Sequence, residues 1–239
     1  MDHPLSARSE VAILMRERPN EGEPWKPLHV EMQRHDYPGK LLVVDGIDGS
    51  GKSTLLAELA KYLNERGQRN ILTKTPSDDV RNMRCWRDWH RPDGPDRSLM
   101  HGYGLTIIAW GDRLVHQRST IEPNLKAGTC VLVDRYFMSP LAFECGIVHK
   151  ELCELLIRPD LSVLLDVPAD LALSRIKARR NEQTHPGDDA ELQVIRRRML
   201  ELANLNDDVV VVPSSRDVKD TLAQVEGHID HLLDASDGR

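Results

Sequence analysis

The stretch LLVVDGIDGSGKST, which spans Leu41–Thr54, constrains the fold of this chain more than any other part of the sequence. Its first four residues are apolar and predict a buried strand, and a glycine-rich turn leads from them into a helical pattern. Gly46, Gly51, Lys52 and Ser53 match the pattern G-x-x-x-x-G-K-[ST] at this junction. A strand, a glycine-rich loop and a helix in this order are typical of a phosphate-binding loop.

The chemistry of such a loop follows from its backbone. Glycines let the chain curl so that several N–H groups point inward, and the N-terminus of the next helix adds a positive potential. Lys52 would add a charge at the β- and γ-phosphates, and Ser53 a hydroxyl for Mg²⁺. We therefore predict that this turn binds a nucleoside triphosphate. Asp48, inside the loop, either stabilises the turn or faces a hydroxyl of a second ligand.

Short apolar runs alternate with longer helical patterns from Lys40 onward. The predicted strands are Leu41–Asp45, Ile71–Thr75, Cys130–Asp134, Ser162–Asp166 and Val209–Val212. The predicted helices are Lys52–Arg66 with a stop at Gly67, Leu99–Gln117, Ala169–Arg180, Ala190–Leu205 and Val218–Leu233. The runs are apolar nearly throughout, which suits strands that are buried on both faces of a parallel sheet. We predict a doubly wound α/β fold, with ligands at the carboxyl ends of the strands.

Composition and charge narrow the class of protein further. The chain has 239 residues, which suits one domain, and its proline-, glycine- and charge-rich residues 1–39 predict an irregular extension before a domain over residues 40–239. A net charge of −6 and 4% aromatic residues disfavour a nucleic-acid partner. The sequence contains no apolar run long enough to span a bilayer and no secretory signal at its start, so we predict a cytoplasmic protein without a membrane partner.

Basic residues stand where predicted strands end. Lys74 closes the second strand, Arg135 follows the third, and Arg113 lies among apolar residues on a predicted helix. An arginine in apolar surroundings needs an anion or a carboxylate partner, so a structural salt bridge competes with a binding role for each one. Three such cations in a fold of this kind favour a second phosphate site, because the guanidinium fork matches phosphate oxygens.

These motifs together resemble the thymidylate kinase family, one of the families of P-loop nucleoside monophosphate kinases. The resemblance runs from about Lys40 to about Leu233. It rests on the segments GIDGSGKST, TKTP, AWGDR, VDRYFMSPLAF and PDLSVLLDVPADLALSRIKARR. The segment VDRYFMSPLAF carries the family's Asp-Arg-Tyr signature, which is its most distinctive motif.

The resemblance implies a role for each matching residue. It implies a helical lid around Arg175–Asp189, a homodimer, ATP as phosphoryl donor, and Mg²⁺ held near Ser53 and Asp134. The catalytic candidates are Lys52, Asp134, Arg135, Arg175 and Arg179. The candidates for binding ATP are Gly46, Gly49, Gly51, Lys52, Ser53, Thr54 and Arg180. The acceptor would contact Asp48 at its 3′-hydroxyl, Lys74 and Arg135 at its phosphate, Arg113 at its base, and Phe143, which stands where the family has a tyrosine associated with choosing deoxyribose. Without the resemblance, the arginine run of the lid is also simply the polar face of a helix.

The acceptor side departs from the family pattern. Lys74 and Thr75 replace an arginine and a glutamate, Pro140 replaces a small or polar residue, and Ala109 replaces the aromatic that stacks on thymine. Trp110 is adjacent, but the next helical position points about 100° away. Either another aromatic fills this space, the candidates being Trp86, Trp89 and Tyr103, or the acceptor has a different base. The segment RCWRDWHRPDGPDRS around the two tryptophans is predicted to be a surface loop.

The leading hypothesis is ATP-dependent phosphoryl transfer to a nucleoside monophosphate, either dTMP or a related or modified deoxynucleotide, giving the diphosphate. The mechanism would depend on positioning and charge neutralisation. The first alternative is a nucleotide-dependent switch or regulatory module with a degenerate acceptor site. The second is a kinase for a nucleoside or another phosphorylated metabolite.

Overall fold

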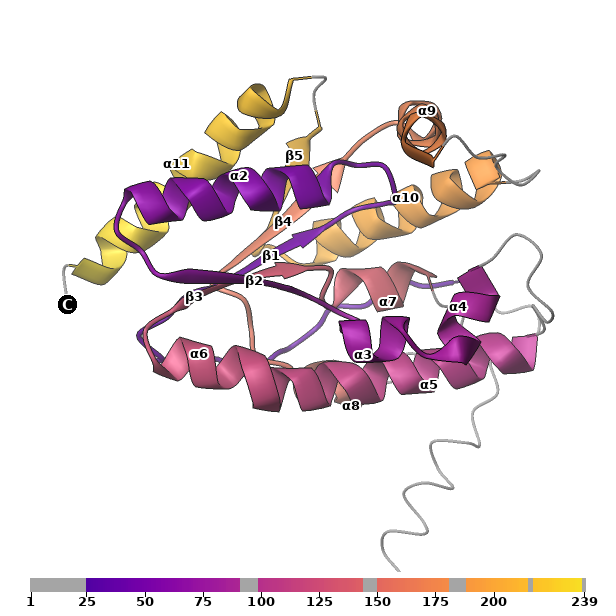
Figure 1. Cartoon of the computed structure of the whole chain (residues 1–239), viewed down its shortest axis with the longest axis horizontal. Coiled ribbons are helices and arrows are strands. Elements are labelled where there is room, and N and C mark those ends of the chain that lie inside the picture. The colour runs from indigo at the N-terminus through magenta and orange to yellow at the C-terminus, as the bar shows by residue number, and fades with distance from the viewer. Residues whose placement is uncertain (1–24, 91–98, 144–149, 181–187, 215–216, 238–239) are drawn as a thin grey trace, which may run out of the picture.

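A sheet of five parallel strands, in the order β2-β3-β1-β4-β5, forms the centre of the molecule (Figure 1). The structure is a computed structural model that describes residues 25–90, 99–143, 150–180, 188–214 and 217–237. The strands are β1 (Leu41–Asp45), β2 (Asn70–Lys74), β3 (Cys130–Asp134), β4 (Leu161–Asp166) and β5 (Val209–Pro213). The predicted doubly wound α/β fold is confirmed, and every predicted strand is present with its ends shifted by at most one residue.

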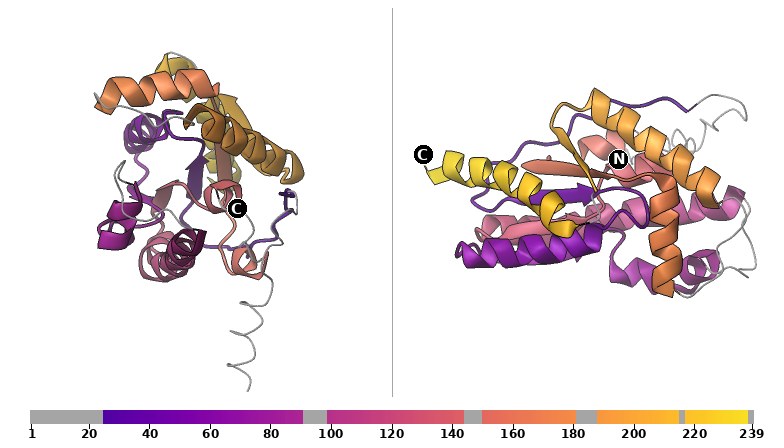
Figure 2. Two further views of the ribbon diagram at one scale, coloured as in Figure 1. Left: turned by 90° about the vertical axis from the view of Figure 1, so that its right-hand side faces the viewer. Right: turned by 90° about the horizontal axis from the view of Figure 1, so that it is seen from above.

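Helices cover both faces of the sheet. The helices are α2 (Lys52–Glu65), α3 (Asp78–Arg81), α4 (Arg84–His90), α5 (Leu99–His116), the π-helical turn η1 (Gln117–Ile121), α6 (Glu122–Lys126), α7 (Met138–Phe143), α8 (Lys150–Glu154), α9 (Ala169–Arg180), α10 (Asp188–Leu205) and α11 (Val218–Asp237). Figure 1 shows α2 and α11 along one side of the sheet and α5 and α6 along the other, and Figure 2 shows the same layers from two further directions.

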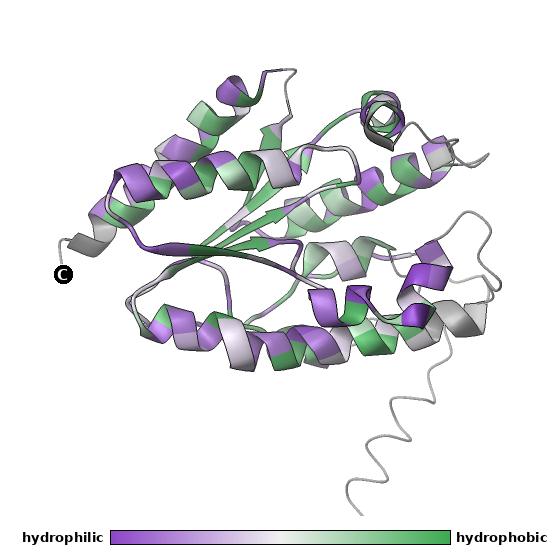
Figure 3. Ribbon diagram, in the orientation of Figure 1, coloured by the Kyte–Doolittle hydropathy of each residue, from purple (hydrophilic) through white to green (hydrophobic). Residues whose placement is uncertain are grey.

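The alternation of side chains along β1 divides the core into two clusters. Leu42 and Val44 pack with the buried face of α2 and with α11, whereas Leu41 and Val43 pack with α5, α6, α7 and α10. Successive residues of a strand point to opposite faces, so an apolar strand of this kind needs a helical layer on each side. The apolar residues accordingly gather on the strands and on the sheet-facing sides of the helices (Figure 3).

The two edge strands are less buried than predicted. Leu72 on β2 is 51% exposed and Val211 on β5 is 41% exposed, whereas β1 is buried throughout. The prediction that every strand is buried on both faces is wrong for these two. The helices are centred over the middle of the sheet, so an apolar run alone does not reveal which strands lie at the edges.

Residues 84–90 form a helix, and the predicted surface loop is wrong for this part of the segment. Contacts at the helical spacing of four residues hold α4 together. Arg84 Nε lies 3.3 Å from Asp88 Oδ2, and the Trp86 ring stacks on His90 with 4.9 Å between ring centroids. The rest of the segment, and the Tyr103 side chain, lie outside the described residues.

The described part of the N-terminal segment, residues 25–39, has no helix or strand and lies against the folded body. One isolated bridge pairs Gln33 with Ile157, and Val30 is buried in the core. Among the described helices, none is both long and apolar enough to cross a membrane.

Candidate active site

The turn between β1 and α2 requires glycine at several positions. Gly46, Gly49 and Gly51 have φ angles of 150°, 78° and 100°, which side-chain-bearing residues rarely adopt. A Cβ at Gly49 would also collide with the carbonyl oxygen of Ala172 in α9. Because α2 begins at Lys52, the unpaired N–H groups of its first turn, which includes Ser53 and Thr54, face this loop. The local geometry is that of an anion cradle.

The side chain of Lys52 lies along the loop. Its Nζ donates hydrogen bonds to the carbonyl oxygens of Gly46, at 3.0 Å, and Ile47, at 2.9 Å. Burial, and then the nearby charge of Arg135, lower the pKa of Lys52 to about 8. A buried ammonium group that is bonded only to carbonyl dipoles here would gain strongly from an anionic ligand.

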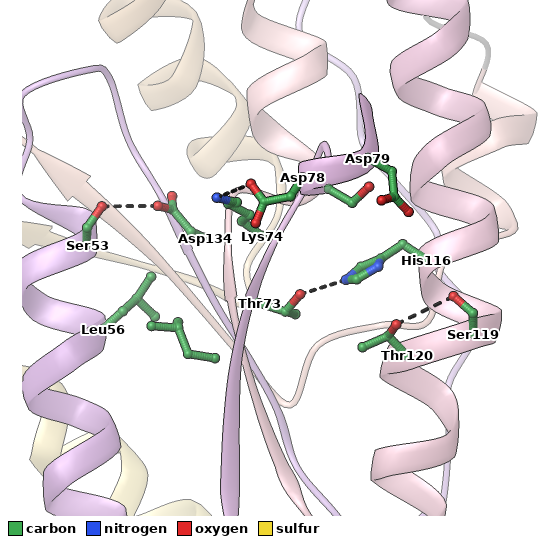
Figure 4. A pocket seen from close by; sticks show the side chains of 12 residues that line it. Ser53, Leu56, Thr73, Lys74, Asp78, Asp79, His116, Ser119, Thr120 and Asp134 are labelled. Carbon is green, nitrogen blue, oxygen red and sulfur yellow. Dashed lines mark hydrogen bonds and ion pairs between the residues drawn. The ribbon is translucent and has the colours of Figure 1, made fainter. Parts of the chain in front are cut away.

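A hydroxyl and a carboxylate face each other beside the loop. Ser53 Oγ, in the first turn of α2, donates to Asp134 Oδ2 at 3.3 Å, and Asp134 stands at the end of β3 (Figure 4). The other carboxylate oxygen of Asp134, Oδ1, is buried and has no hydrogen-bond partner within the described part of the chain. Such an oxygen is costly unless it binds something. Oxygen ligands of this kind are those that Mg²⁺ prefers.

Arg135 brings several of the predicted acceptor residues together. Its Nη1 donates to Gly46 O at 3.3 Å, and its Nη2 lies 2.5 Å from Asp48 Oδ1. The guanidinium carbon lies 5.1 Å from the centre of the Phe143 ring. The side chain of Asp48 is 63% exposed and that of Arg135 is 12% exposed, so this ion pair lies at the mouth of the site. Because Asp48 is open to solvent, an anionic ligand that enters through the mouth can compete with it for the Arg135 guanidinium group.

The backbone of Arg135 is held in an unusual conformation. Its φ angle is 67°, in the left-handed region that few non-glycine residues occupy. The Thr75 hydroxyl donates to its carbonyl oxygen at 2.7 Å, and its N–H donates to Val44 O at 3.0 Å. Thr75, which departs from the family pattern, therefore joins the end of β2 to the residue after β3.

Asp45 is a functional candidate that the sequence reasoning missed. The carboxylate is 1% exposed, and it accepts hydrogen bonds from the backbone N–H of Tyr136 and from both the N–H and the hydroxyl of Ser139. Burial raises the pKa of Asp45, although the Ser139 bond and the charge of Arg135 oppose this rise. Ser139 Oγ also accepts a hydrogen bond from Arg135 Nη1 at 3.1 Å. The available sequence signal was an acidic residue that closes an otherwise apolar strand.

Lys74 and Arg113 have protein partners in this structure. Lys74 Nζ lies 2.6 Å from Asp78 Oδ1, on the exposed side of the β2 terminus. Arg113 is 3% exposed, and it donates from Nε to Tyr136 O at 2.9 Å and from Nη1 to Ala109 O at 3.2 Å. These bonds connect Arg113 to the residue after Arg135 and Lys74 to the first residue of α3, and they do not join either side chain to the other predicted acceptor residues.

Two further residues organise this side of the site. The Asp112 carboxylate accepts from the backbone N–H and the hydroxyl of Ser77, which fixes the segment after β2 against α5. Arg81, which the sequence reasoning missed, donates from Nε to Pro76 O at 2.7 Å. Burial, and then the charge of Arg135, lower the pKa of Arg81. Arg81 is thus a second cation near Arg135, and nothing in the local sequence distinguishes it from an ordinary helix residue.

Arg175, on the helix α9 that belongs to the predicted lid, connects α9 to the phosphate-binding loop. Its Nη1 donates to Ser214 Oγ at 3.0 Å and to Gly49 O at 3.4 Å. Ser214 Oγ in turn donates to Ser50 O at 2.7 Å, which ties the segment after β5 to the same loop. Arg179 and Arg180 lie in the last turn of α9, but their side chains, and residues 181–187 of the predicted lid, are outside the described residues.

A cavity of about 560 Å³ adjoins the site at the edge of the sheet. It lies beside β2, with Ser53 and Asp134 at one end and His116 at the other (Figure 4). His116 Nε2 is 2.7 Å from Thr73 Oγ1, and burial lowers the pKa of the imidazole, which favours its neutral form. The Ser53–Asp134 pair is therefore open to a largely polar cavity beside β2.

The expected aromatic contact at Ala109 is not made by its neighbour. Trp110 is 2% exposed and packs in the core, as its helical position predicts. Ala109 is itself buried, and the described partner of the Trp86 ring is His90 within α4. The acceptor side therefore keeps the departure from the family pattern that the sequence shows.

The glycine-rich loop, the Ser53–Asp134 pair and Arg135 all lie at the carboxyl ends of the neighbouring parallel strands β1 and β3. This arrangement is that of a P-loop phosphotransferase. Comparison with known proteins gives the family. The thymidylate kinase family model matches residues 44–225. The probable thymidylate kinases of Thermococcus gammatolerans and Pyrococcus horikoshii are both 31% identical to this chain, over 82% of it and 98% of their own length. The thymidylate kinase of Xanthomonas campestris is 36% identical over 62% of this chain and 65% of its own length.

The chain belongs to the thymidylate kinase family. It is therefore an enzyme, a nucleoside monophosphate kinase that transfers a phosphoryl group from ATP to its acceptor and forms the diphosphate. Family membership favours this function over the nucleotide-dependent switch and over a kinase for nucleosides or other metabolites.

Proposed function

We propose that the acceptor of this kinase is dTMP and that Arg135 binds its phosphate. The position of the Arg135 guanidinium carries this proposal. It contacts Gly46 of the phosphate-binding loop on one side and Asp48 at the open mouth on the other. A phosphate that displaces Asp48 from this guanidinium group would lie next to the γ-phosphate of ATP held in the loop. The curated relatives, which are thymidylate kinases, support dTMP as the acceptor.

Phosphoryl transfer then needs positioning more than covalent chemistry. An ionised oxygen of the acceptor phosphate attacks the γ-phosphorus of ATP, the new P–O bond forms, and the bond to the β,γ-bridging oxygen breaks. The bond pair leaves with ADP. No general base is needed, because the attacking oxygen carries no proton. Lys52 and Arg175, with Arg179 and Arg180 of the lid, would hold and neutralise the oxygens of the transferring group.

Ser53 and Asp134 are the residues that would hold Mg²⁺. The buried, unpartnered Oδ1 of Asp134 and the Ser53 hydroxyl opposite it are hard oxygen donors that fit this ion. The ion, when bound, would neutralise charge on the β- and γ-phosphates. The remaining ligands of Mg²⁺ in such sites are usually phosphate oxygens and water.

The other acceptor contacts belong to the same proposal. Asp48 would accept a hydrogen bond from the 3′-hydroxyl of the sugar once the phosphate takes its place on Arg135. Lys74, and also Arg81, would add positive charge around that phosphate. Arg113 would reach the base, and Phe143 would line the sugar side. Pro140 and Ala109 depart from the family pattern on this side of the site, so monophosphates with bases other than thymine should also be tested.

The test is an acceptor panel with products identified by mass. Purified protein with ATP and Mg²⁺ is mixed with dTMP, dUMP, dCMP, dAMP, dGMP and UMP. We expect dTDP to form with the highest kcat/KM. Efficient phosphorylation of another monophosphate in place of dTMP would overturn the acceptor assignment, and the Arg135→Ala variant, assayed in parallel, controls for contaminating kinases.

We further propose a homodimer formed through α5. An exposed stripe on this helix contains Gly104, Ile107, Gly111 and Val115. Ile107 is 59% exposed and Val115 is 67% exposed. Apolar side chains between glycines let two helices approach closely, which suits a second copy of the same face.

The remaining expectations stay predictions. These are the division into an extension over residues 1–39 and a domain over residues 40–239, a cytoplasmic location, and the absence of nucleic-acid and membrane partners.

A further inference from the structure

The N-terminal segment of residues 25–39 precedes the family match, which begins at residue 44, yet it is bound along its length to the kinase body. The N–H of Val30 donates at 3.0 Å to Oδ1 of Asn206, the residue that follows α10. The N–H of Gln33 donates to Leu156 O at 2.8 Å, and the N–H of Gly39 donates to Leu125 O at 2.9 Å. The segment therefore runs past the residues that follow α10 and α8 and reaches α6 as a fixed strap.

Trp25, at the described start of this strap, lies at the end of α7. Its indole Nε1 donates to the carbonyl oxygen of Leu141 at 3.2 Å. The guanidinium carbon of Arg198, on α10, lies 5.4 Å from the centre of the Trp25 ring, and Arg198 Nη1 donates to Ala142 O at 3.1 Å. Two side chains from outside α7 thus satisfy two successive carbonyl groups of its last turn.

The described part of α7 spans the six residues Met138–Phe143. Helical stability in proteins comes mostly from tertiary contacts, so donors that reach a helix from outside add to it. Trp25 and Arg198 therefore hold the last described turn of α7 from outside, and we call this pair of donors the cap.

The capped helix holds Arg135 from both of its ends. Ser139, in its first turn, accepts a hydrogen bond from Arg135 Nη1, and Phe143, its last residue, has its ring beneath the Arg135 guanidinium. Movement of the end of α7 would therefore displace the Phe143 ring and change the position of the guanidinium group. Misplacement by about 1 Å can cost about 100-fold in rate at a reacting centre.

We propose that Trp25 and Arg198 are positioning residues for the acceptor: the strap caps α7, and α7 in turn fixes Arg135 for binding of the acceptor phosphate. This inference rests on the proposed acceptor role of Arg135. The bonds described for Trp25 and Arg198 reach α7 and no residue of the phosphate-binding loop. We therefore expect the strap to change the affinity for the acceptor much more than the affinity for ATP.

The test compares KM values for the two substrates in full-length variants. Trp25→Phe keeps a ring beside Arg198 and removes the N–H donor, so the KM for the acceptor should rise about fivefold, which is the value of one hydrogen bond. Trp25→Ala, which also removes the ring, should raise it about tenfold or more. The KM for ATP should change less than twofold in both variants. Lys26→Ala and Arg197→Ala, exposed neighbours of the two residues, are the controls.

Amide hydrogen exchange of the peptide over residues 138–143 gives a readout that does not depend on activity. Exchange there should be faster in Trp25→Ala than in wild type and unchanged in Lys26→Ala. Unchanged exchange in Trp25→Ala would overturn the cap. Faster exchange with an unchanged acceptor KM, or equal rises of both KM values, would overturn the positioning role. If the wild type phosphorylates no monophosphate, the proposed acceptor site fails on its own, and the exchange experiment still decides whether the cap exists.

Discussion

Ser139 makes two hydrogen bonds to one oxygen of Asp45, Oδ1: its N–H donates at 3.2 Å and its Oγ donates at 2.5 Å. The same hydroxyl oxygen accepts a hydrogen bond from Arg135 Nη1. A buried carboxylate at the end of β1 therefore orients, through one hydroxyl group, the arginine that follows β3. This relay requires a carboxylate at position 45, because the groups that face Asp45 donate hydrogen bonds and a carboxylate can accept from all of them.

Asp45→Asn should weaken both folding and acceptor binding. The groups that face Asp45 are hydrogen-bond donors, and the NH2 group of asparagine cannot accept from them. Buried polar groups are then left unpaired, so the free energy of unfolding should fall by about 1–3 kcal/mol. Denaturant unfolding and the KM for dTMP measure the two effects. Asp36→Asn, at an exposed aspartate, is the matched control. A variant as stable as wild type would contradict the role of Asp45 as a buried anchor.

Ser139→Ala tests the contact between Ser139 and Arg135 while the Asp45 carboxylate stays in place. This variant keeps the backbone bond to Asp45 and removes only the hydroxyl group that Arg135 contacts. We expect the acceptor KM to rise about fivefold or more and the free energy of unfolding to fall, because the hydroxyl loses its hydrogen bonds to two charged groups, Asp45 and Arg135. An acceptor KM equal to that of wild type would show that Arg135 is oriented without this hydroxyl.

Arg135 should tolerate neither loss of charge nor loss of its fork. Arg135→Ala should lower kcat/KM for dTMP by about 100- to 1,000-fold, in the range seen when one transition-state donor is removed. Arg135→Lys should recover part of this loss, because lysine keeps the charge but cannot bind two oxygens in one plane. Arg66→Ala, which removes an exposed arginine paired with Asp230, serves as the control. An Arg135→Ala enzyme within threefold of wild type would place the acceptor phosphate elsewhere.

Glu122 should give the fold a stabilising contribution that disappears in acid. Hydrogen bonds from Lys126, Arg118 and Tyr37 lower the pKa of this carboxyl from 4.5 to about 2. The unfolded chain therefore binds more protons between these two pH values. The contribution is complete above pH 4.5 and is lost as the pH falls toward about 2. The difference in stability between wild type and Glu122→Gln should shrink between pH 6 and pH 3, and a constant difference would contradict this assignment.

Ile107→Glu should convert the proposed dimer to a monomer. In the proposed dimer, a carboxylate at the centre of the α5 stripe would lose its hydration against the second copy. The free energy cost of this desolvation is far larger than the contribution of an exposed contact. Sedimentation equilibrium at several concentrations measures the mass. Val211→Glu, on the exposed edge strand β5, introduces the same group elsewhere and should leave the mass unchanged. A wild-type protein that is monomeric at all concentrations would refute the interface.

Much of this protein can be predicted from the order of its residues. Leu41–Asp45, the glycines after it and the helix that starts at Lys52 follow one another directly in the sequence, and the positive φ angles of Gly46, Gly49 and Gly51 are a local property of this turn. Buried central strands and long helices also carry their own periodicity, so their positions follow from the sequence to within a few residues. The same local information led to the phosphate-binding loop and to Ser53, whereas the role of Asp134 came from the family resemblance.

Only the tertiary structure decided what lies around Arg135. Asp45 reads in the sequence as the last residue of a strand, and its partner Ser139 lies 94 residues away. Trp25 belongs to a segment with no regular pattern, and it reaches α7 across 116 residues of chain. Exposure of β2 and β5, likewise, depends on which strands lie at the sheet edges. Residue order determines local conformation through short-range sterics and hydrogen bonds, whereas contacts between distant segments exist only once burial of the apolar faces has brought those segments together.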